Sequence, residues 1–149
     1  MCAVVQRVSQ ARVIVEERTV GSIGAGLLAL VSVAVDDDER DARALAEKIS
    51  GLRIFPDDAG LMNRSVVQTG GGVLVVSQFT LHGDVRHGRR PSFIEAAKEP
   101  MARKLYELTG RLIESSGVTV AYGVFGAHME VELVNNGPVT ILIDTHRAF

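Results

Sequence analysis

Three polar side chains follow a short apolar run, and they are the first candidates for chemistry. The run Val73–Val76 predicts a strand covered on both faces, and directly after it come Ser77, Gln78 and Thr80. Alternation along an extended strand predicts that Gln78 and Thr80 share one face, while Ser77 lies with Phe79 on the other. Because ligands often bind at the carboxyl ends of strands in α/β sheets, this segment is either a strand end with satisfied polar groups or the wall of a pocket.

A Gly-Pro pair at the start of the last predicted strand is the second unusual feature. The strand residues Val139–Ile143 are apolar or β-branched, and four turn residues, Asn135–Pro138, precede them. Proline has no N–H for a sheet ladder, so Pro138 belongs at a strand start, an edge or a bulge. Asn136-Gly137 alone would already form a hairpin turn, so the proline needs another explanation.

The basic loop, residues 86–90, is the third feature. Arg86, Arg89 and Arg90 place three positive charges within five residues. This loop is either a solvated surface or a local contact for phosphate groups. The net charge of the whole chain is −2, which argues against a protein that coats nucleic acid in bulk.

Other sets of reactive side chains give weak patterns. The four His residues and the single Cys show none of the ligand spacings typical of zinc. A triad of Ser77, His82 and Asp84 would come from one short segment, whereas triad partners usually come from separate segments.

Length and composition predict one domain, residues 1–149, with enough chain to bury a core. The single cysteine, Cys2, excludes an internal disulfide and fits a reducing compartment. The longest apolar run, Leu27–Val35, is too short to span a bilayer. We therefore expect a cytoplasmic protein that does not enter a membrane.

Apolar periodicity predicts several strands and two main helices. Strands are expected at residues 3–15, 19–23, 27–35, 53–55, 73–81, 118–122, 129–134 and 139–144. One helix follows the capping candidates Asp36–Asp38 and ends near Gly51, and the other starts near Pro100. Their apolar stripes are Ala42, Leu45, Ala46 and Ile49, and Met101, Leu105, Leu108 and Leu112. This order predicts an α/β fold in which mixed β-sheets carry the helices on one side.

The motifs SQFTL (77–81), GRRPSF (88–93) and NNGPVT (135–140) together resemble those of the D-aminoacyl-tRNA deacylase family. The similarity extends over nearly the whole chain. It implies a layered β/β/α fold and a homodimeric hydrolase with active sites at the subunit interface. The implied substrate is the 3′ end of an aminoacyl-tRNA that carries a D-amino acid or glycine. Neither a metal nor an organic cofactor is implied.

The resemblance also implies roles for single residues. Gly137 and Pro138, joined by a cis bond, would project from one subunit into the active site of the other and exclude L side chains. A cis bond precedes only about 5–6% of prolines in folded proteins, so one here would need a reason. Arg7 matches a residue that holds this pair in place.

The implied reaction is hydrolysis of an ester, in which the substrate carbonyl oxygen becomes an oxyanion. Backbone N–H groups near Gln78, Phe79 and Thr80, in the catalytic segment that begins at Ser77, are the expected stabilisers. Thr80 is the only well-placed hydroxyl, but no His is clearly positioned to activate it. The resemblance implies that the 2′-hydroxyl of the tRNA helps to activate water, and that Thr80 mainly shapes the site.

Three alternatives stay open. One is the related enzyme that removes L-Ala from mischarged tRNA; it has a small residue in the position of Phe79, so Phe79 and Val139 argue against it. The second is an esterase with Thr80 as its nucleophile. The third is a non-catalytic, dimeric RNA-binding module that uses the basic loop.

Overall fold

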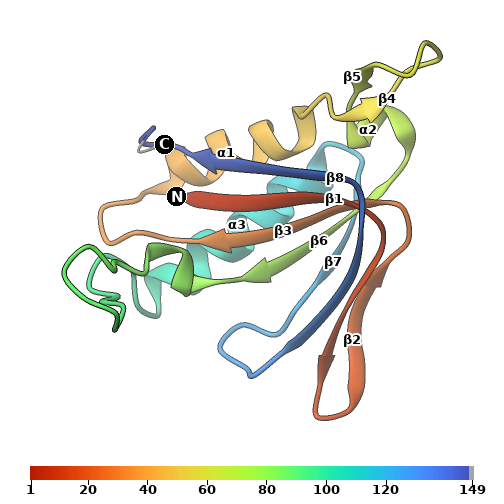
Figure 1. Ribbon diagram of the computed structural model, residues 1–149. Helices are drawn as coiled ribbons and strands as arrows, with labels where there is room; N and C mark the ends of the chain where they lie inside the picture. Colours follow the sequence, from red (N-terminus) through yellow and green to blue (C-terminus); the bar gives the residue numbers. More distant parts are fainter. Residues whose placement is uncertain (148–149) are drawn as a thin grey trace.

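The computed structural model describes residues 1–147, which form two long helices and a large mixed sheet (Figure 1). In chain order the elements are β1 (Cys2–Val15), β2 (Arg18–Ile23), β3 (Gly26–Ser32), α1 (Glu39–Gly51), β4 (Phe55–Pro56), β5 (Met62–Arg64), α2 (Val66–Thr69), β6 (Gly72–Ser77), the 3-10 helix η1 (Phe79–His82), α3 (Met101–Ser115), β7 (Thr119–Tyr122) and β8 (Glu130–Asp144). Among these residues, no helix is both long and apolar enough to cross a membrane.

The large sheet is organised around β1. One edge of β1 pairs antiparallel with β3 and then with β2, while its other edge pairs antiparallel with β8. Strands β6 and β7 extend the sheet beyond β3 in parallel register. Figure 1 shows β1 and β8 bending together, which carries β2 away from the plane of β3 and β6.

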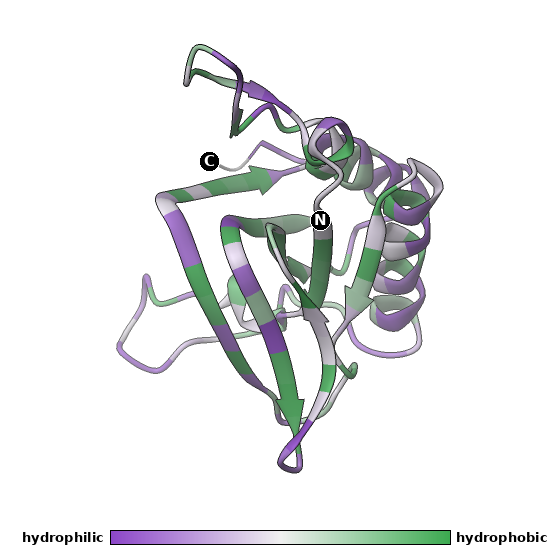
Figure 2. Cartoon of the chain, turned by 90° about the vertical axis from the view of Figure 1, so that its right-hand side faces the viewer, coloured by the Kyte–Doolittle hydropathy of each residue, from purple (hydrophilic) through white to green (hydrophobic). Residues whose placement is uncertain are grey.

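The bend creates two hydrophobic layers. One cluster lies between the sheet and the helices and includes Val5, Leu27 and Leu45. The other lies between the two arms of the sheet and includes Val13 and Leu74. Hydrophobic and hydrophilic bands accordingly alternate along the long strands in Figure 2. The result is the β/β/α arrangement that the family resemblance implies, with α1 and α3 on one side, as the order of elements predicts.

The helices begin close to the predicted positions. Asp38 caps α1, and the side chain of Asp41 completes the capping box. The predicted stripe of α1 is buried throughout. In α3, of the predicted stripe only Leu105 is fully buried, because the face against the core is centred on Ala102, Thr109 and Ile113.

Four strand predictions need correction. The strand expected at 53–55 is only the two-residue β4, which begins at Phe55. The strand expected at residues 73–81 ends at Ser77 and continues as η1. The strand expected at 27–35 ends at Ser32. Residues 130–144 form one continuous strand in which the Gly-Pro pair sits in a bulge, so Asn135–Pro138 do not separate two strands.

Candidate active site

A cavity of about 490 Å³ opens at the carboxyl end of β6. Ser77, Gln78 and Phe79 line it, so three of the four predicted catalytic residues lie together in its wall. The rest of the wall includes Phe93, Tyr106, Phe125 and Met129 from later segments of the chain. Phe93 closes the GRRPSF motif, but no sequence pattern placed any of these four side chains at the site. The lining is largely apolar, as expected for a ligand pocket with a few polar groups that orient its occupant.

The turn into η1 determines which backbone groups can act on a ligand. The Gln78 N–H donates to the carbonyl oxygen of Val31 at 2.8 Å, so this predicted oxyanion donor is already in use. Phe79 and Thr80 are the first two residues of η1, and the first N–H groups of a helix have no partner within it. The N–H groups of Phe79 and Thr80 are therefore the two adjacent donors that this turn provides.

Phe79 forms the aromatic rim of the cavity. Its side chain is 56% exposed and meets Phe93 edge-on, with ring centroids 5.1 Å apart. Asp84 and Ser92 fix the position of Phe93 because their backbone groups exchange hydrogen bonds of 2.8 and 2.9 Å. The prediction that Ser77 and Phe79 share a strand face is wrong, since the chain leaves the extended conformation after Ser77.

Thr80 lies beside the cavity wall and is not part of its lining. Its hydroxyl oxygen accepts a hydrogen bond from the Gln78 side-chain amide. The nearest histidine in sequence, His82, instead contacts Ser32 Oγ through Nδ1 and Cys2 Sγ through Nε2. Thr80 is therefore not hydrogen-bonded to His82, and His82 does not act as a base for it.

Burial favours the uncharged forms of His82 and of its neighbour Cys2. Burial lowers the pKa of His82, and burial raises the pKa of the Cys2 thiol to about 11. Cys2 is therefore a thiol near neutral pH and a weak nucleophile. The triad of Ser77, His82 and Asp84 does not assemble, because the Asp84 carboxylate is bonded to Arg86.

The Gly-Pro pair lies in an exposed bulge of β8. Asn136, Gly137, Pro138 and Val139 lie between the pairs Gln6↔Thr140 and Val8↔Asn135, opposite Arg7 alone on β1. The bond between Gly137 and Pro138 is cis, as the family resemblance implies. Gly137 has a φ of +151°, a conformation that favours glycine.

The Arg7 side chain is hydrogen-bonded to this bulge. Its Nε donates to the carbonyl oxygen of Asn136 at 2.8 Å, directly before the Gly-Pro pair. Its Nη1 donates to the carbonyl oxygen of Ile54 at 2.5 Å, which ties the bulge to the segment before β4.

The bulge and the cavity are separated within this chain. Arg7, Gly137 and Pro138 are not part of the cavity lining. Arg7 pairs with Leu27 on β3, four residues before Val31 at the cavity, which corresponds to about 13 Å along the strand. A single copy of the chain therefore does not bring the two predicted halves of the active site together.

The three arginines of the basic loop differ in whether a carboxylate pairs with them. Arg86 forms two side-chain hydrogen bonds with Asp84, and this interaction lowers the pKa of Asp84 to about 2. Within residues 1–147, Arg89 and Arg90 are exposed and take part in no ion pair. The loop thus offers two uncompensated positive charges, one fewer than its sequence suggests.

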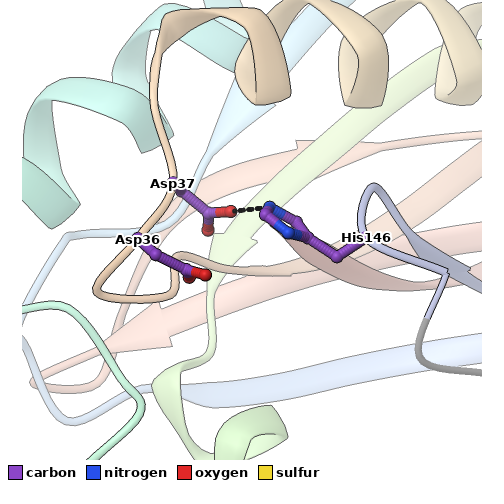
Figure 3. Close-up of side chains that lie close together, drawn as sticks. All are labelled: Asp36, Asp37 and His146. Carbon is purple, nitrogen blue, oxygen red and sulfur yellow. Dashed lines mark hydrogen bonds and ion pairs between the residues drawn. The ribbon is translucent and has the colours of Figure 1, made fainter.

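A separate cluster joins the loop before α1 to the end of the described chain (Figure 3). Ligand atoms of Asp36, Asp37 and His146 lie within 4.8 Å of one another, a grouping that sequence spacing could not show. The Asp37 carboxylate already binds the Met1 amino group, the Ala34 N–H and His146 Nε2. These contacts connect Met1 and His146 to Asp37 in the loop before α1.

Comparison with known proteins gives consistent results. A family model described as D-Tyr-tRNA(Tyr) deacylase matches residues 4–144. The D-aminoacyl-tRNA deacylase of Thermotoga petrophila is 58% identical over 149 residues and is covered over 100% of both chains. That of Symbiobacterium thermophilum is 55% identical over 147 residues, which cover 99% of this chain and 97% of the relative.

Two solved structures share the fold. A structure described as the c-Myc DNA Unwinding Element Binding Protein has a TM-score of 0.91 at 34% identity, covering 97% of this chain and 99% of the other. A probable eukaryotic D-amino acid tRNA deacylase has a TM-score of 0.81 at 17% identity, covering 95% and 97%. The family model and the full-length relatives establish that the chain belongs to the D-aminoacyl-tRNA deacylase family of hydrolases.

Proposed function

We propose that this protein hydrolyses the ester bond between a D-amino acid and the 3′ end of tRNA, and so proofreads the chirality of aminoacyl-tRNA in the cytoplasm. The observation that carries this proposal is the SQFTL segment at the cavity. It places Ser77, Gln78 and Phe79 in the cavity wall and begins a helical turn with the N–H groups of Phe79 and Thr80.

These two N–H groups would stabilise the oxyanion that forms when water attacks the ester carbonyl. One such donor contributes roughly 3–4 kcal/mol in acyl transfer. His82, the nearest histidine in sequence, is not arranged to turn Thr80 into a nucleophile, because it is bonded to Ser32 and Cys2. The vicinal 2′-hydroxyl of the terminal ribose would therefore assist the attacking water.

The active site would be completed by a second copy of the chain. Gly137 and Pro138 are exposed and distant from the cavity of their own chain, so they are free to enter another one. Strand β8, which carries them, pairs with β1 alone among the described strands and bears exposed Leu133, Val134 and Leu142. An unpaired edge with exposed apolar side chains is typical of an association surface.

In this homodimer the Gly137 and Pro138 carbonyl oxygens would accept a hydrogen bond from the substrate amino group. They would occupy the space that an L side chain needs. A D-amino acid or glycine places no group there, so glycyl-tRNA, including glycine mischarged on tRNA-Ala, would also be hydrolysed.

Release of labelled tyrosine from D-Tyr-tRNA tests the activity directly. We expect turnover that is proportional to enzyme and persists after extensive dialysis against a chelator. Binding of D-Tyr-tRNA without release of tyrosine would instead indicate the RNA-binding module.

Thr80→Ala should retain deacylation within roughly tenfold of the wild type, because about one hydrogen bond, that from Gln78, is lost. Initial rates on D-Tyr-tRNA measure the effect. The Thr80-nucleophile alternative makes the opposite prediction, a loss of several orders of magnitude and an acyl group trapped on Thr80.

The basic loop, with Arg86, Arg89 and Arg90, would contact phosphates of the single-stranded acceptor end. Each phosphate contact on a single strand contributes a slope of about −0.7 to log affinity against log salt. We expect the double variant Arg89→Ala/Arg90→Ala to reduce the slope by about 1.4, since both charges are uncompensated. Arg86→Ala should change it less, because Asp84 already binds Arg86. Equal slopes in all variants would identify the loop as a solvated surface.

A further inference from the structure

The bulge that carries Gly137 and Pro138 is closed by side chains of its own strand. Asn135 lies before the pair, and its Oδ1 accepts a hydrogen bond from the Val139 N–H after the pair at 2.9 Å. The side-chain amide of Asn135 also donates to Thr140 Oγ1 at 3.3 Å. Asn135 therefore joins both ends of the segment that contains the Gly-Pro pair.

Thr140 connects this closure to β1. Its hydroxyl oxygen accepts a second hydrogen bond from Gln6 Nε2 at 3.1 Å. Gln6 and Thr140 are also register partners, and they form the last regular pair before the bulge. One hydroxyl oxygen thus links the bulge to the regular part of the ladder.

Side chains are needed here because the ladder is interrupted. Four residues of β8 lie opposite Arg7, so regular strand pairing cannot fix the direction of the segment between Asn135 and Thr140. The contacts of Gln6 and Asn135 with Thr140 are exposed in this chain. Hydrogen bonds of this kind contribute little to net stability, because water competes for the same groups. Their main effect is on the geometry of the bulge.

We propose that Asn135 and Thr140, together with Gln6, are positioning residues that set the direction in which the Gly137-Pro138 pair faces the substrate. This inference rests on the proposed role of that pair as the stereochemical filter. Arg7 holds the carbonyl group before the pair, while Asn135 and Thr140 hold the chain on both sides of it. A displacement of about 1 Å at such a contact can change a rate by about 100-fold.

The pair Thr140→Val and Thr140→Ser tests this proposal. Valine preserves the shape of threonine but cannot accept the two hydrogen bonds, whereas serine retains the hydroxyl. The ratio of kcat/KM for D-Tyr-tRNA over L-Tyr-tRNA should fall by about 10- to 100-fold in Thr140→Val and stay near the wild-type value in Thr140→Ser. Asn135→Ala should lower the ratio in the same way, with thermal melting used to confirm that each variant is folded.

Matched controls come from similar residues far from the bulge. Thr119→Val changes an exposed threonine of β7, and Asn63→Ala removes a side-chain amide of β5 that donates to the Asp57 carboxylate. Both variants should keep the wild-type ratio of kcat/KM for D-Tyr-tRNA over L-Tyr-tRNA.

Gly137→Ala, measured in parallel, separates this proposal from the one on which it rests. If Gly137→Ala changes the ratio while Thr140→Val and Asn135→Ala do not, the filter stands and the positioning role is wrong. If Gly137→Ala leaves the ratio unchanged as well, the filter itself is wrong, and the positioning role fails with it.

Discussion

Replacing Gly137 by alanine is expected to slow D-Tyr-tRNA deacylation by about 100-fold while the chain stays folded. An added Cβ would lie 2.6 Å from Val139 Cγ2 and 2.7 Å from Val139 N, and the φ of +151° is unfavourable for an L residue. The bulge must therefore shift at the point where we place the substrate. Single-turnover rates on D-Tyr-tRNA, with thermal melting of the same samples, measure both parts of this prediction.

Gly24→Ala is the matched control. A Cβ at Gly24 would meet no atom within 4 Å, so this variant should keep the wild-type rate. A Gly137→Ala variant that is as active as Gly24→Ala would show that the bulge takes no part in the active site.

The helices were predictable because their signals are local. The Asp38 cap and the apolar spacing of α1 lie within one short segment, and both are confirmed in the structure. The end of β6 is different, because it depends on a neighbouring strand. Phe79 and Thr80 are strand-favouring residues, but the ladder between β6 and β3 ends at Val31↔Ser77. Without a partner strand, the chain turns into η1.

The candidate site was predictable only in part for the same reason. SQFTL marks one wall of the cavity, but Phe93, Tyr106, Phe125 and Met129 reach the other walls through long-range packing. No period in the sequence relates these residues to Ser77. Asp37 and His146 are 109 positions apart, so their contact could not be predicted from sequence spacing either. Gly137 and Pro138 were identified by family resemblance, since their distance from the cavity hides any role within a single chain.

The largest expected effect is stereochemical. If the carbonyl groups of Gly137 and Pro138 occupy the space of an L side chain, exclusion does not depend on which side chain it is. D-Tyr-tRNA and Gly-tRNA should both be hydrolysed. L-Tyr-tRNA should be hydrolysed about 10⁴-fold more slowly than D-Tyr-tRNA, which corresponds to a difference of about 5.5 kcal/mol in activation free energy. A rigid clash combined with a lost hydrogen bond to the substrate amino group can supply this difference. Release of labelled amino acid from the three charged tRNAs at equal enzyme concentration measures it.

Gly-tRNA is the informative control, because glycine has no side chain at either the L or the D position of its α-carbon. If the enzyme instead selected substrates by binding the D side chain, it would hydrolyse D-Tyr-tRNA but leave Gly-tRNA intact. A filter that only excludes L side chains must accept both. Comparable rates on D-Tyr-tRNA and L-Tyr-tRNA would contradict exclusion altogether, while hydrolysis of D-Tyr-tRNA alone would replace exclusion with positive recognition of the D side chain in the apolar cavity beside Phe79.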